Sequence, residues 1–524
     1  MKLDVLDAEY FNAADYFVDR NVREGRKDKV AILCEDRQMT YGTLAKEVNR
    51  FGNALLSNGF RMENRVAVMM LDMELYPVVF FGSIKAGAVP ICLNTLMRPK
   101  DYLYFLNDSR ARVLVIDESL YFNIEEIKDE LKYLERIIMV NSTQDRPEVT
   151  TYDDFVRDQP DSLEPAQTGP DDACFWLYSS GSTGKPKGTV HLQHDMLFTV
   201  ETYGKQVLQV REDDICFSAA KLFFAYGLGN GTYFPFSVGA TTVLMPERPT
   251  PESVYRTIAL HEPTVFFGVP TLYGAMLASE EGKVNGVRLC VSAGEALPAD
   301  IFYRWKDRFN VDILDGIGST EIAHIYISNR VENIRPGSTG QIVPGYEAKI
   351  VDNEFNPVPP GEIGTVLIKG DSTAAYYWNR HDKTKEAMLG EWFNTDDKFF
   401  VDEEGFFFYV GRSNDMLKVG GIWVSPIEVE ACLIGHPAVL ECAVVPSRDE
   451  ENLVKPCAYI VLNKEFEASE ALEKEIKTYV KKELAHYKFP RWVYFVKDLP
   501  KTATGKVKRF ELKNLEDQKS MVSA

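Results

Sequence analysis

The sequence has few residues of the kinds that hold metals or cross-links. Its 524 residues include eight cysteines and seven histidines, with no Cys-x-x-Cys pair and no zinc-site spacing. We therefore expect reduced thiols in an intracellular, cytoplasmic protein. The longest apolar run, near 78–93, is interrupted by Ser83 and Lys85. It cannot supply the roughly 20 apolar residues of a membrane helix, and the acidic N-terminus does not resemble a signal peptide.

Positive charge is also scarce. The chain has 59 Lys and Arg against 78 Asp and Glu, a formal net charge of −19. A protein that binds nucleic acid over a broad surface is normally basic, so we expect no nucleic-acid partner. One local exception lies between 481 and 509, where nine Lys or Arg stand against Glu483 and Asp498. This segment predicts a basic face.

Short apolar runs alternate with helical patterns over the first 300 residues, which is typical of α/β layers. A helix is predicted at 41–60, ending at Asn58-Gly59, and strands at 30–34, 66–71, 88–93, 113–116, 174–177, 241–245, 264–269 and 288–292. Prolines then punctuate short strands from about 335, at 347–351 and 364–368, which predicts a β-rich subdomain.

The last hundred residues predict a separate small α/β unit, with helices at 426–434 and 469–485 and strands at 439–446, 456–462 and 492–496. A turn-like polar stretch precedes it. We therefore predict an N-terminal domain at 1–412 and a mobile C-terminal domain at 413–524, with a hinge near Asn414.

The strongest local signal is a glycine-rich loop, Tyr178-Ser-Ser-Gly-Ser-Thr-Gly-Lys-Pro-Lys-Gly188, which follows an apolar strand. Glycines let consecutive amides face a phosphate, and hydroxyls and lysines complete a site for an anion. It is not a Walker loop, because Gly181 precedes Gly184-Lys185 by three positions and Pro186 replaces the Ser or Thr that binds magnesium.

This loop resembles the phosphate loop of the adenylate-forming superfamily, which includes acyl-CoA synthetases, adenylation domains and firefly-luciferase-type enzymes. Five further motifs follow in the family's order: Gly294-Glu-Ala296, Asp315-Gly-Ile-Gly-Ser-Thr-Glu321, Trp392-Phe-Asn-Thr-Asp-Asp397, Gly411-Arg-Ser-Asn-Asp-Met-Leu-Lys-Val-Gly-Gly421 and Pro500-Lys-Thr-Ala-Thr-Gly-Lys506. Two positions depart from the family pattern. Asp396 replaces the usual glycine, and Asn414 replaces the usual Asp or Lys.

The resemblance implies that a carboxylate and ATP form an acyl-adenylate, which a thiol then attacks. Lys506 would stabilise charge between the carboxylate and the α-phosphate, Thr320 would bind the α-phosphate, and Glu321 would ligate Mg²⁺. Asp397 would accept the ribose hydroxyls, with Arg412 assisting. The full set implied to contact ATP or AMP is Ser179, Ser180, Gly181, Ser182, Thr183, Gly184, Lys185, Gly294, Glu295, Ala296, Asp315, Gly316, Ile317, Asp397 and Arg412. Lys418, Gly420 and Gly421 would line a tunnel for coenzyme A.

The acyl pocket of the superfamily lies between the segment 223–229 and the residues that follow the Thr-Glu motif. Both segments are similar to those of benzoate–CoA ligases, which implies that Ala225, Tyr226, Gly318, His324 and Ile325 contact an aryl ring; Lys506 would reach the carboxylate. Phe223 and Phe224 are expected to serve packing instead.

The resulting hypothesis is an AMP-forming benzoate–CoA ligase that uses ATP, Mg²⁺ and coenzyme A, as a monomer or homodimer. Other acids remain open: 4-hydroxybenzoate, 2-aminobenzoate, and cyclohexane or cyclohexene carboxylates. Further alternatives are an adenylating enzyme that serves a carrier protein, a luciferase-type oxygenase and a non-catalytic adenylate-binding protein.

Overall fold

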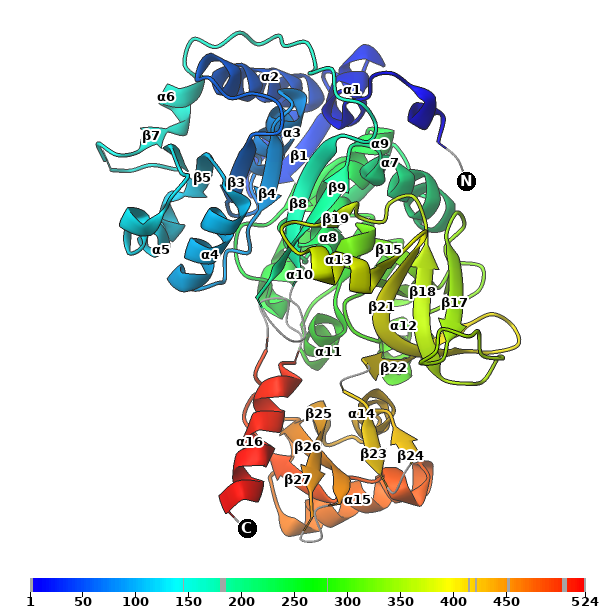
Figure 1. Ribbon diagram of the computed structural model, residues 1–524. Coiled ribbons are helices and arrows are strands. Elements are labelled where there is room, and N and C mark those ends of the chain that lie inside the picture. The colour runs from blue at the N-terminus through cyan, green and yellow to red at the C-terminus, as the bar shows by residue number, and fades with distance from the viewer. Residues whose placement is uncertain are drawn as a thin grey trace.

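The computed structural model describes residues 3–144, 146–179, 185–279, 281–412, 415–419, 422–449, 453–501 and 507–522. It confirms the predicted α/β fold: a large N-terminal domain contains three sheets, and a small C-terminal domain lies below it in Figure 1. Among the described residues, no helix combines the length and apolar character that a membrane crossing requires.

Two large sheets form most of the N-terminal domain; both are parallel in the centre, and the first is antiparallel at both edges and the second at one edge. The first has the strand order β16 (Gln341–Ile342), β15 (Ile325–Ser328), β14 (Ile313–Gly318), β13 (Leu289–Ser292), β12 (Val265–Gly268), β10 (Ile215–Ser218), β11 (Thr241–Leu244), β1 (Val30–Cys34) and β2 (Arg37–Thr40). The second has the order β19 (Tyr376–Tyr377), β9 (Lys187–Leu192), β8 (Ala173–Ser179), β4 (Val89–Cys92), β3 (Arg65–Met69), β5 (Val113–Asp117), β6 (Arg136–Val140) and β7 (Thr150–Thr151). Strands joined by helices give this parallel pairing, as the sequence pattern predicts.

The helices of this domain cover and separate the two sheets. Their bounds are α1 (Arg20–Arg23), α2 (Tyr41–Ser57), α3 (Leu75–Lys85), α4 (Pro99–Ser109), α5 (Phe122–Glu125), α6 (Tyr152–Val156), α7 (Asp195–Thr199), η5 (Val200–Leu208), α8 (Ala225–Leu228), η6 (Gly229–Tyr233), α9 (Phe234–Val238), α10 (Pro251–His261), α11 (Pro270–Ala278), α12 (Ala299–Phe309), η7 (Thr320–Ile322) and α13 (His381–Ala387).

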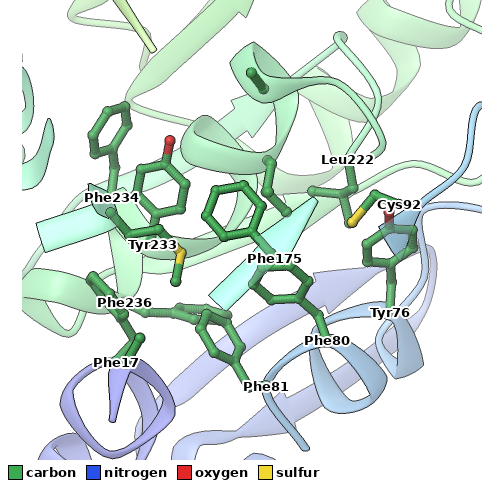
Figure 2. Close-up of a cluster of buried hydrophobic side chains, with 14 of the residues drawn as sticks. Phe17, Tyr76, Phe80, Phe81, Cys92, Phe175, Leu222, Tyr233, Phe234 and Phe236 are labelled. Atoms are coloured by element: carbon green, nitrogen blue, oxygen red, sulfur yellow. The ribbon is translucent and has the colours of Figure 1, made fainter. Parts of the chain in front are cut away.

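The longest apolar run of the sequence forms α3 and β4. Every residue of α3 from Tyr76 to Lys85 is buried, as expected for a helix that is apolar all round. Figure 2 shows its aromatic side chains within the shared core: Phe80 packs against Phe175 of β8, and Phe81 against Phe236 of α9, with ring centroids 5.8 and 6.0 Å apart. This core holds the two sheets together and fixes the relative position of their strand ends.

An antiparallel sheet forms the predicted β-rich subdomain. Its strands are β17 (Glu347–Val351), β18 (Gly364–Lys369), β21 (Trp392–Val401), β20 (Met388–Leu389) and β22 (Phe407–Arg412). In this sheet Asp397 of β21 lies directly opposite Arg412 of β22. Two motifs that are separate in the sequence thereby meet.

The C-terminal domain contains the elements that the sequence predicts and several that it does not. The predicted elements are α14 (Pro426–Ile434), β25 (Val439–Arg448), β26 (Val454–Leu462), α15 (Glu470–Glu483) and β27 (Trp492–Phe495). The unexpected elements include the hairpin of β23 (Leu417–Val419) and β24 (Ile422–Val424), the short turn η8 (His486–Lys488) and α16 (Arg509–Val522), the red helix of Figure 1. Of these, α16 has the clearest supports. Its Leu512 is buried against β25 and β26, and its Glu516 accepts hydrogen bonds from Ser447 and Tyr459.

Candidate active site

A cavity of about 1770 Å³ brings together most of the predicted site residues that the structure describes. It lies at the carboxyl ends of parallel strands, where α/β proteins commonly bind ligands: β8 leads into the glycine-rich loop, β13 into Gly294-Glu295, and β14 into Thr320-Glu321. The C-terminal domain contributes to the wall through Lys501, Lys508 and Phe510, among others.

The predicted residues divide into three groups. Those that line the cavity are Ser179, Lys185, Ala225, Tyr226, Gly294, Glu295, Gly318, Thr320, Glu321, His324, Ile325, Asp397 and Arg412. Ala296, Asp315, Gly316 and Ile317 stand in the same motifs but are not part of the lining. Ser180, Gly181, Ser182, Thr183, Gly184, Asn414, Gly420, Gly421 and Lys506 lie outside the described residues, as does the side chain of Lys418. Phe223 and Phe224, expected only to pack, also line the cavity.

The charge of the cavity wall differs from that of the whole chain. Among the described residues, eleven basic and ten acidic side chains line it, whereas the chain as a whole carries 59 basic and 78 acidic residues. Distant acids are screened over about 8 Å at physiological salt. The cavity can therefore accept small anions although the protein is acidic.

Thr320 and Glu321 stand in the three-residue turn η7, whose backbone is fixed from several sides. The amide of Ala374 donates a hydrogen bond to the carbonyl of Glu321 (2.7 Å), and the hydroxyl of Ser372 donates one to the carbonyl of Ile322 (2.8 Å). The Tyr377 hydroxyl donates to Oε1 of Glu321 (2.8 Å). The carboxylate is thus oriented at the cavity wall.

Glu321 suits Mg²⁺, a hard ion that prefers oxygen ligands and is usually held by one or two carboxylates together with substrate phosphates. The described residues contain no group of three or more acidic, histidine or cysteine side chains that could hold a metal alone. A single carboxylate beside an anion-accepting cavity therefore fits a metal that arrives with a nucleotide.

Asp397 and Arg412 form a pair across neighbouring strands. Arg412 Nε lies 3.4 Å from Asp397 Oδ1, and the carboxylate raises the pKa of Arg412 above its ordinary value. Asp397 is 6% exposed and Asp396 is exposed, and both line the cavity. Asp396 has φ +59°, a left-handed conformation that explains the usual glycine; aspartate is among the few other residues that adopt it.

Tyr226 and His324 form an aromatic wall with their rings 5.5 Å apart. The Tyr226 hydroxyl donates to the carbonyls of Val291 (3.1 Å) and Gly268 (3.3 Å), at the ends of two strands. Glycine is required at 318, because a Cβ there would lie 2.5 Å from the carbonyl oxygen of His324. These contacts give the wall a fixed shape.

His324 is 2% exposed, and burial lowers its pKa to about 3, so the ring stays neutral at physiological pH. Its Nε2 lies 3.1 Å from Asn230 Oδ1 and 3.3 Å from the Tyr226 carbonyl. Both atoms are acceptors, so Nε2 carries the proton and Nδ1 is an acceptor. Nδ1 has no hydrogen-bond partner within the described part of the chain.

Two lysines stand next to the segment 180–184. Lys185 Nζ lies 5.3 Å from the ring centroid of Tyr104, and Lys187 Nζ lies 4.1 Å from that of Tyr377. Burial lowers the pKa of Lys187, an effect that the nearby Glu321 opposes. Both cations line the cavity, and Lys187 is the one that interacts with Glu321.

The predicted basic face of 481–509 is partly compensated in three dimensions, because acids from outside that segment pair with several of its cations. Lys488 lies 2.6 Å from Glu428, Lys501 2.7 Å from Glu441, and Arg509 2.5 Å from Glu430. The sequence window could not include these partners. A direct link also joins the domains, since the amide of Val507 donates to Oε1 of Glu295 (3.3 Å).

Three residues of the site were not anticipated from the sequence. Tyr377 orients Glu321, Asn230 holds His324, and His191 contacts the carbonyl of Thr320 (2.7 Å). Asn230 directly follows the predicted aromatic segment, and His191 closely follows the glycine-rich loop. Proximity to a motif is therefore the signal by which Asn230 and His191 could have been found, and no such signal marks Tyr377.

Two models of known protein families match this chain. The AMP-binding enzyme model matches residues 18–378, and the AMP-binding enzyme C-terminal domain model matches residues 428–506. The chain belongs to the AMP-binding enzyme family. The resemblance inferred from the six motifs is thereby confirmed.

Its similar relatives include ligases of aromatic acids. The chain is 48% identical over 512 residues to the benzoate–CoA ligase of Thauera aromatica, covering 97% of this chain and 96% of that one. Its structure matches that of the anthranilate CoA ligase AuaEII in complex with anthranoyl-AMP with a TM-score of 0.95 and 44% identity, over 98% of each chain. It matches a benzoate CoA ligase from Burkholderia xenovorans LB400 with a TM-score of 0.89 and 45% identity, over 96% and 99%.

Proposed function

We propose that this AMP-binding enzyme is an aryl–CoA ligase that converts benzoate, ATP and coenzyme A to benzoyl-CoA, AMP and pyrophosphate. The observation that carries the proposal is the single cavity in which Thr320-Glu321, Asp397-Arg412 and the Tyr226–His324 wall meet. The aromatic-acid ligases among its relatives support the same activity.

In the first half-reaction a carboxylate oxygen of the acid attacks the α-phosphorus of ATP. The bond from the α-phosphorus to the bridging oxygen breaks, and pyrophosphate leaves. Asp397 accepts hydrogen bonds from the ribose hydroxyls, and Thr320 donates a hydrogen bond to the α-phosphate. Lys506 stabilises the negative charge that develops between the carboxylate and the α-phosphate. The position of its neighbours supports the role of Lys506, since Lys501 lines the cavity and Val507 binds Glu295.

Glu321 would hold Mg²⁺, which neutralises phosphate charge when it is bound. The chain's own contribution is the orientation of that carboxylate, which Tyr377 fixes through its hydroxyl. Lys187 and Arg412 add positive charge near Glu321, as their electrostatic interaction with it indicates. The wall thus offers both cations and a metal-binding carboxylate to a polyphosphate.

In the second half-reaction the sulfur of coenzyme A attacks the acyl carbon, the bond to AMP breaks, and the thiol proton passes to solvent. We assign the domain boundary to 412/413, with a hinge at Asn414 and a tunnel lined by Lys418, Gly420 and Gly421. The described structure supports a division here, because β22 ends at Arg412 and the next strand, β23, begins at Leu417. Rotation of the small domain between the two half-reactions would replace the adenylation arrangement of the site with the thioester-forming one.

The wall favours a flat, uncharged ring. Tyr226, His324 and Phe224 enclose the inner end of the cavity with aromatic surface, and the neutral His324 brings no charge to it. Benzoate fits these requirements without a further polar partner. The eight cysteines form no disulfide in the described structure, which supports a reducing, cytoplasmic location, and the assembly we propose is a monomer or homodimer.

Thioester formation from a panel of acids tests the proposal. The panel comprises benzoate, 4-hydroxybenzoate, 2-aminobenzoate, cyclohexene carboxylate and a long-chain fatty acid, each with ATP, Mg²⁺ and coenzyme A. Benzoate is expected to give the highest kcat/KM and the fatty acid no product. A preference for a hydroxylated, aminated or alicyclic acid would overturn the benzoate assignment. Transfer to a carrier protein but not to free coenzyme A would overturn the ligase assignment.

A further inference from the structure

A buried histidine contacts the backbone of the site from behind the cavity wall. His191, in β9, is 0% exposed and is not part of the cavity lining. Its ring stacks on Phe175 with centroids 4.8 Å apart. Nε2 lies 2.7 Å from the carbonyl oxygen of Thr320, and Nδ1 lies 2.7 Å from Asp195 Oδ2. His191 thus bridges a buried carboxylate and the Thr-Glu turn.

The direction of the bond to Thr320 follows from the chemistry of its two partners. A carbonyl oxygen can only accept, so Nε2 carries a proton. The Nδ1–Asp195 contact holds one further proton, on the ring or on the carboxyl, and the pair is neutral overall in both arrangements. The amide of Leu192 also donates to Asp195 Oδ2 (3.1 Å), which fixes that carboxyl. His191 therefore always donates to Thr320.

This bond completes an unusual support for a very short element. The carbonyls of Thr320, Glu321 and Ile322 each accept a hydrogen bond from another part of the chain: from His191, Ala374 and Ser372 respectively. The turn then ends at Ala323, whose φ of +65° is strained for a residue with a side chain. Such a conformation persists only where its surroundings hold it.

We propose that His191 is a positioning residue, which through the Thr320 carbonyl sets the place of the Thr320 hydroxyl and the Glu321 carboxylate for Mg²⁺ and ATP. The proposal rests on the function proposed above for those two residues. Displacements of about 1 Å in an active site can cost on the order of 10²-fold in rate. His191 touches no substrate, so its effect passes through the turn.

Two substitutions separate the hydrogen bond from the ring. In His191→Gln the side-chain amide reaches about as far as Nε2 and can donate to Thr320. In His191→Asn the amide reaches only about as far as Nδ1, towards Asp195. Both lose the stacking on Phe175. His194→Gln serves as the control for stability, because His194 also borders Asp195 but its ring nitrogens contact the carbonyls of Pro170 and Asp371 (both 2.9 Å).

The first readout is the affinity for ATP, measured by calorimetry with Mg²⁺ and with a chelator. We expect the gain in affinity that Mg²⁺ provides to fall about tenfold in His191→Asn, to be largely restored in His191→Gln, and to be unchanged in His194→Gln. The second readout compares formation of benzoyl-adenylate with thioesterification of supplied benzoyl-adenylate. Only the first of these should fall in His191→Asn.

Equal losses in the Asn and Gln variants, or equal losses in both half-reactions, would overturn the proposal and leave His191 a purely structural residue. The proposed function fails separately, if the wild-type protein forms no adenylate from any acid of the panel. The calorimetric comparison still decides the role of His191 in that case, because it requires ATP and Mg²⁺ but no acid.

Discussion

The shape of the acyl wall depends on the missing side chain of Gly229, which makes Gly229→Ala an informative substitution. A Cβ at this position would lie 2.6 Å from His324 Cδ2 and 2.7 Å from the Tyr233 hydroxyl. Neither neighbour can yield easily, because His324 is bonded to Asn230 (3.1 Å) and the Tyr233 hydroxyl to the Ala323 carbonyl (3.2 Å). An ordinary contact is about 3.4–4 Å, so His324 has to move into the cavity.

The expected magnitude follows from two opposing effects. Overpacking of a buried site costs about 1–3 kcal/mol, and replacing a helical glycine with alanine returns about 0.5–1 kcal/mol. The balance is a loss of about 0–2.5 kcal/mol in the free energy of unfolding. The effect on binding is separate: His324 displaced into the acyl pocket removes space there, and a change of one methylene in a hydrophobic pocket is worth about 10–200-fold. We therefore expect KM for benzoate to rise by about tenfold or more, whereas KM for ATP should not change.

The assay is steady-state thioester formation with one substrate varied at a time, accompanied by thermal unfolding. Gly274→Ala is the matched control, because it is also a helical glycine but its Cβ would meet only Ile301, at 3.6 Å. An equal rise in KM for ATP, or an unchanged KM for benzoate in a destabilised protein, would refute the placement of the aryl ring against His324.

Three further predictions concern the lysine motif, the buried Asp315 and the C-terminal domain. Lys506→Ala should lower adenylate formation by a factor of about 10²–10³ and leave thioesterification of supplied benzoyl-adenylate nearly unchanged; equal losses would contradict its role. Burial raises the pKa of Asp315 to about 8, so the folded protein binds a proton that the unfolded chain releases near pH 4. Stability should therefore fall as the pH rises from 4 to 8, by up to about 1.4 kcal/mol per pH unit, and chemical denaturation of Asp315→Asn should show a weaker dependence. Arg509→Met leaves Glu430 buried without its cation and should lower the free energy of unfolding by about 3–5 kcal/mol. Adding Glu430→Gln removes the buried charge and should restore part of that stability, as measured by calorimetric unfolding. If the double variant is no more stable than Arg509→Met, the ion pair does not stabilise the domain.

Much of the fold was accessible because its signals are local. The apolar run at 30–34 became β1 with those bounds, and the helix from Tyr41 ended at the predicted Asn58 boundary. Helix α16 was missed for the opposite reason. Of its described side chains only Leu512 and Glu516 are buried, and Glu516 is held by Ser447 and Tyr459 from distant strands. The sequence of this segment has no periodic apolar face from which a helix could be predicted.

The site shows the same division. The six motifs are contiguous in sequence, so their resemblance to the motifs of a known family could be recognised, and that resemblance implied the chemistry they serve. The supports of those residues come from elsewhere in the chain: Tyr377 lies 56 positions from Glu321, and His191 lies 129 positions from Thr320. The charge of the site likewise depends on pairs such as Arg509–Glu430, which only folding brings together. Sequence therefore predicted the groups that react, and the structure revealed those that hold them.

The central claim is that this chain activates an aromatic acid by joining it to AMP. The most direct test is the exchange of labelled pyrophosphate into ATP in the absence of coenzyme A, because exchange requires reversible formation of the acyl-adenylate. We predict exchange that depends on both benzoate and Mg²⁺ and is lost in Lys506→Ala. Exchange that occurs equally without any acid, or no exchange with any aromatic acid, would contradict the account.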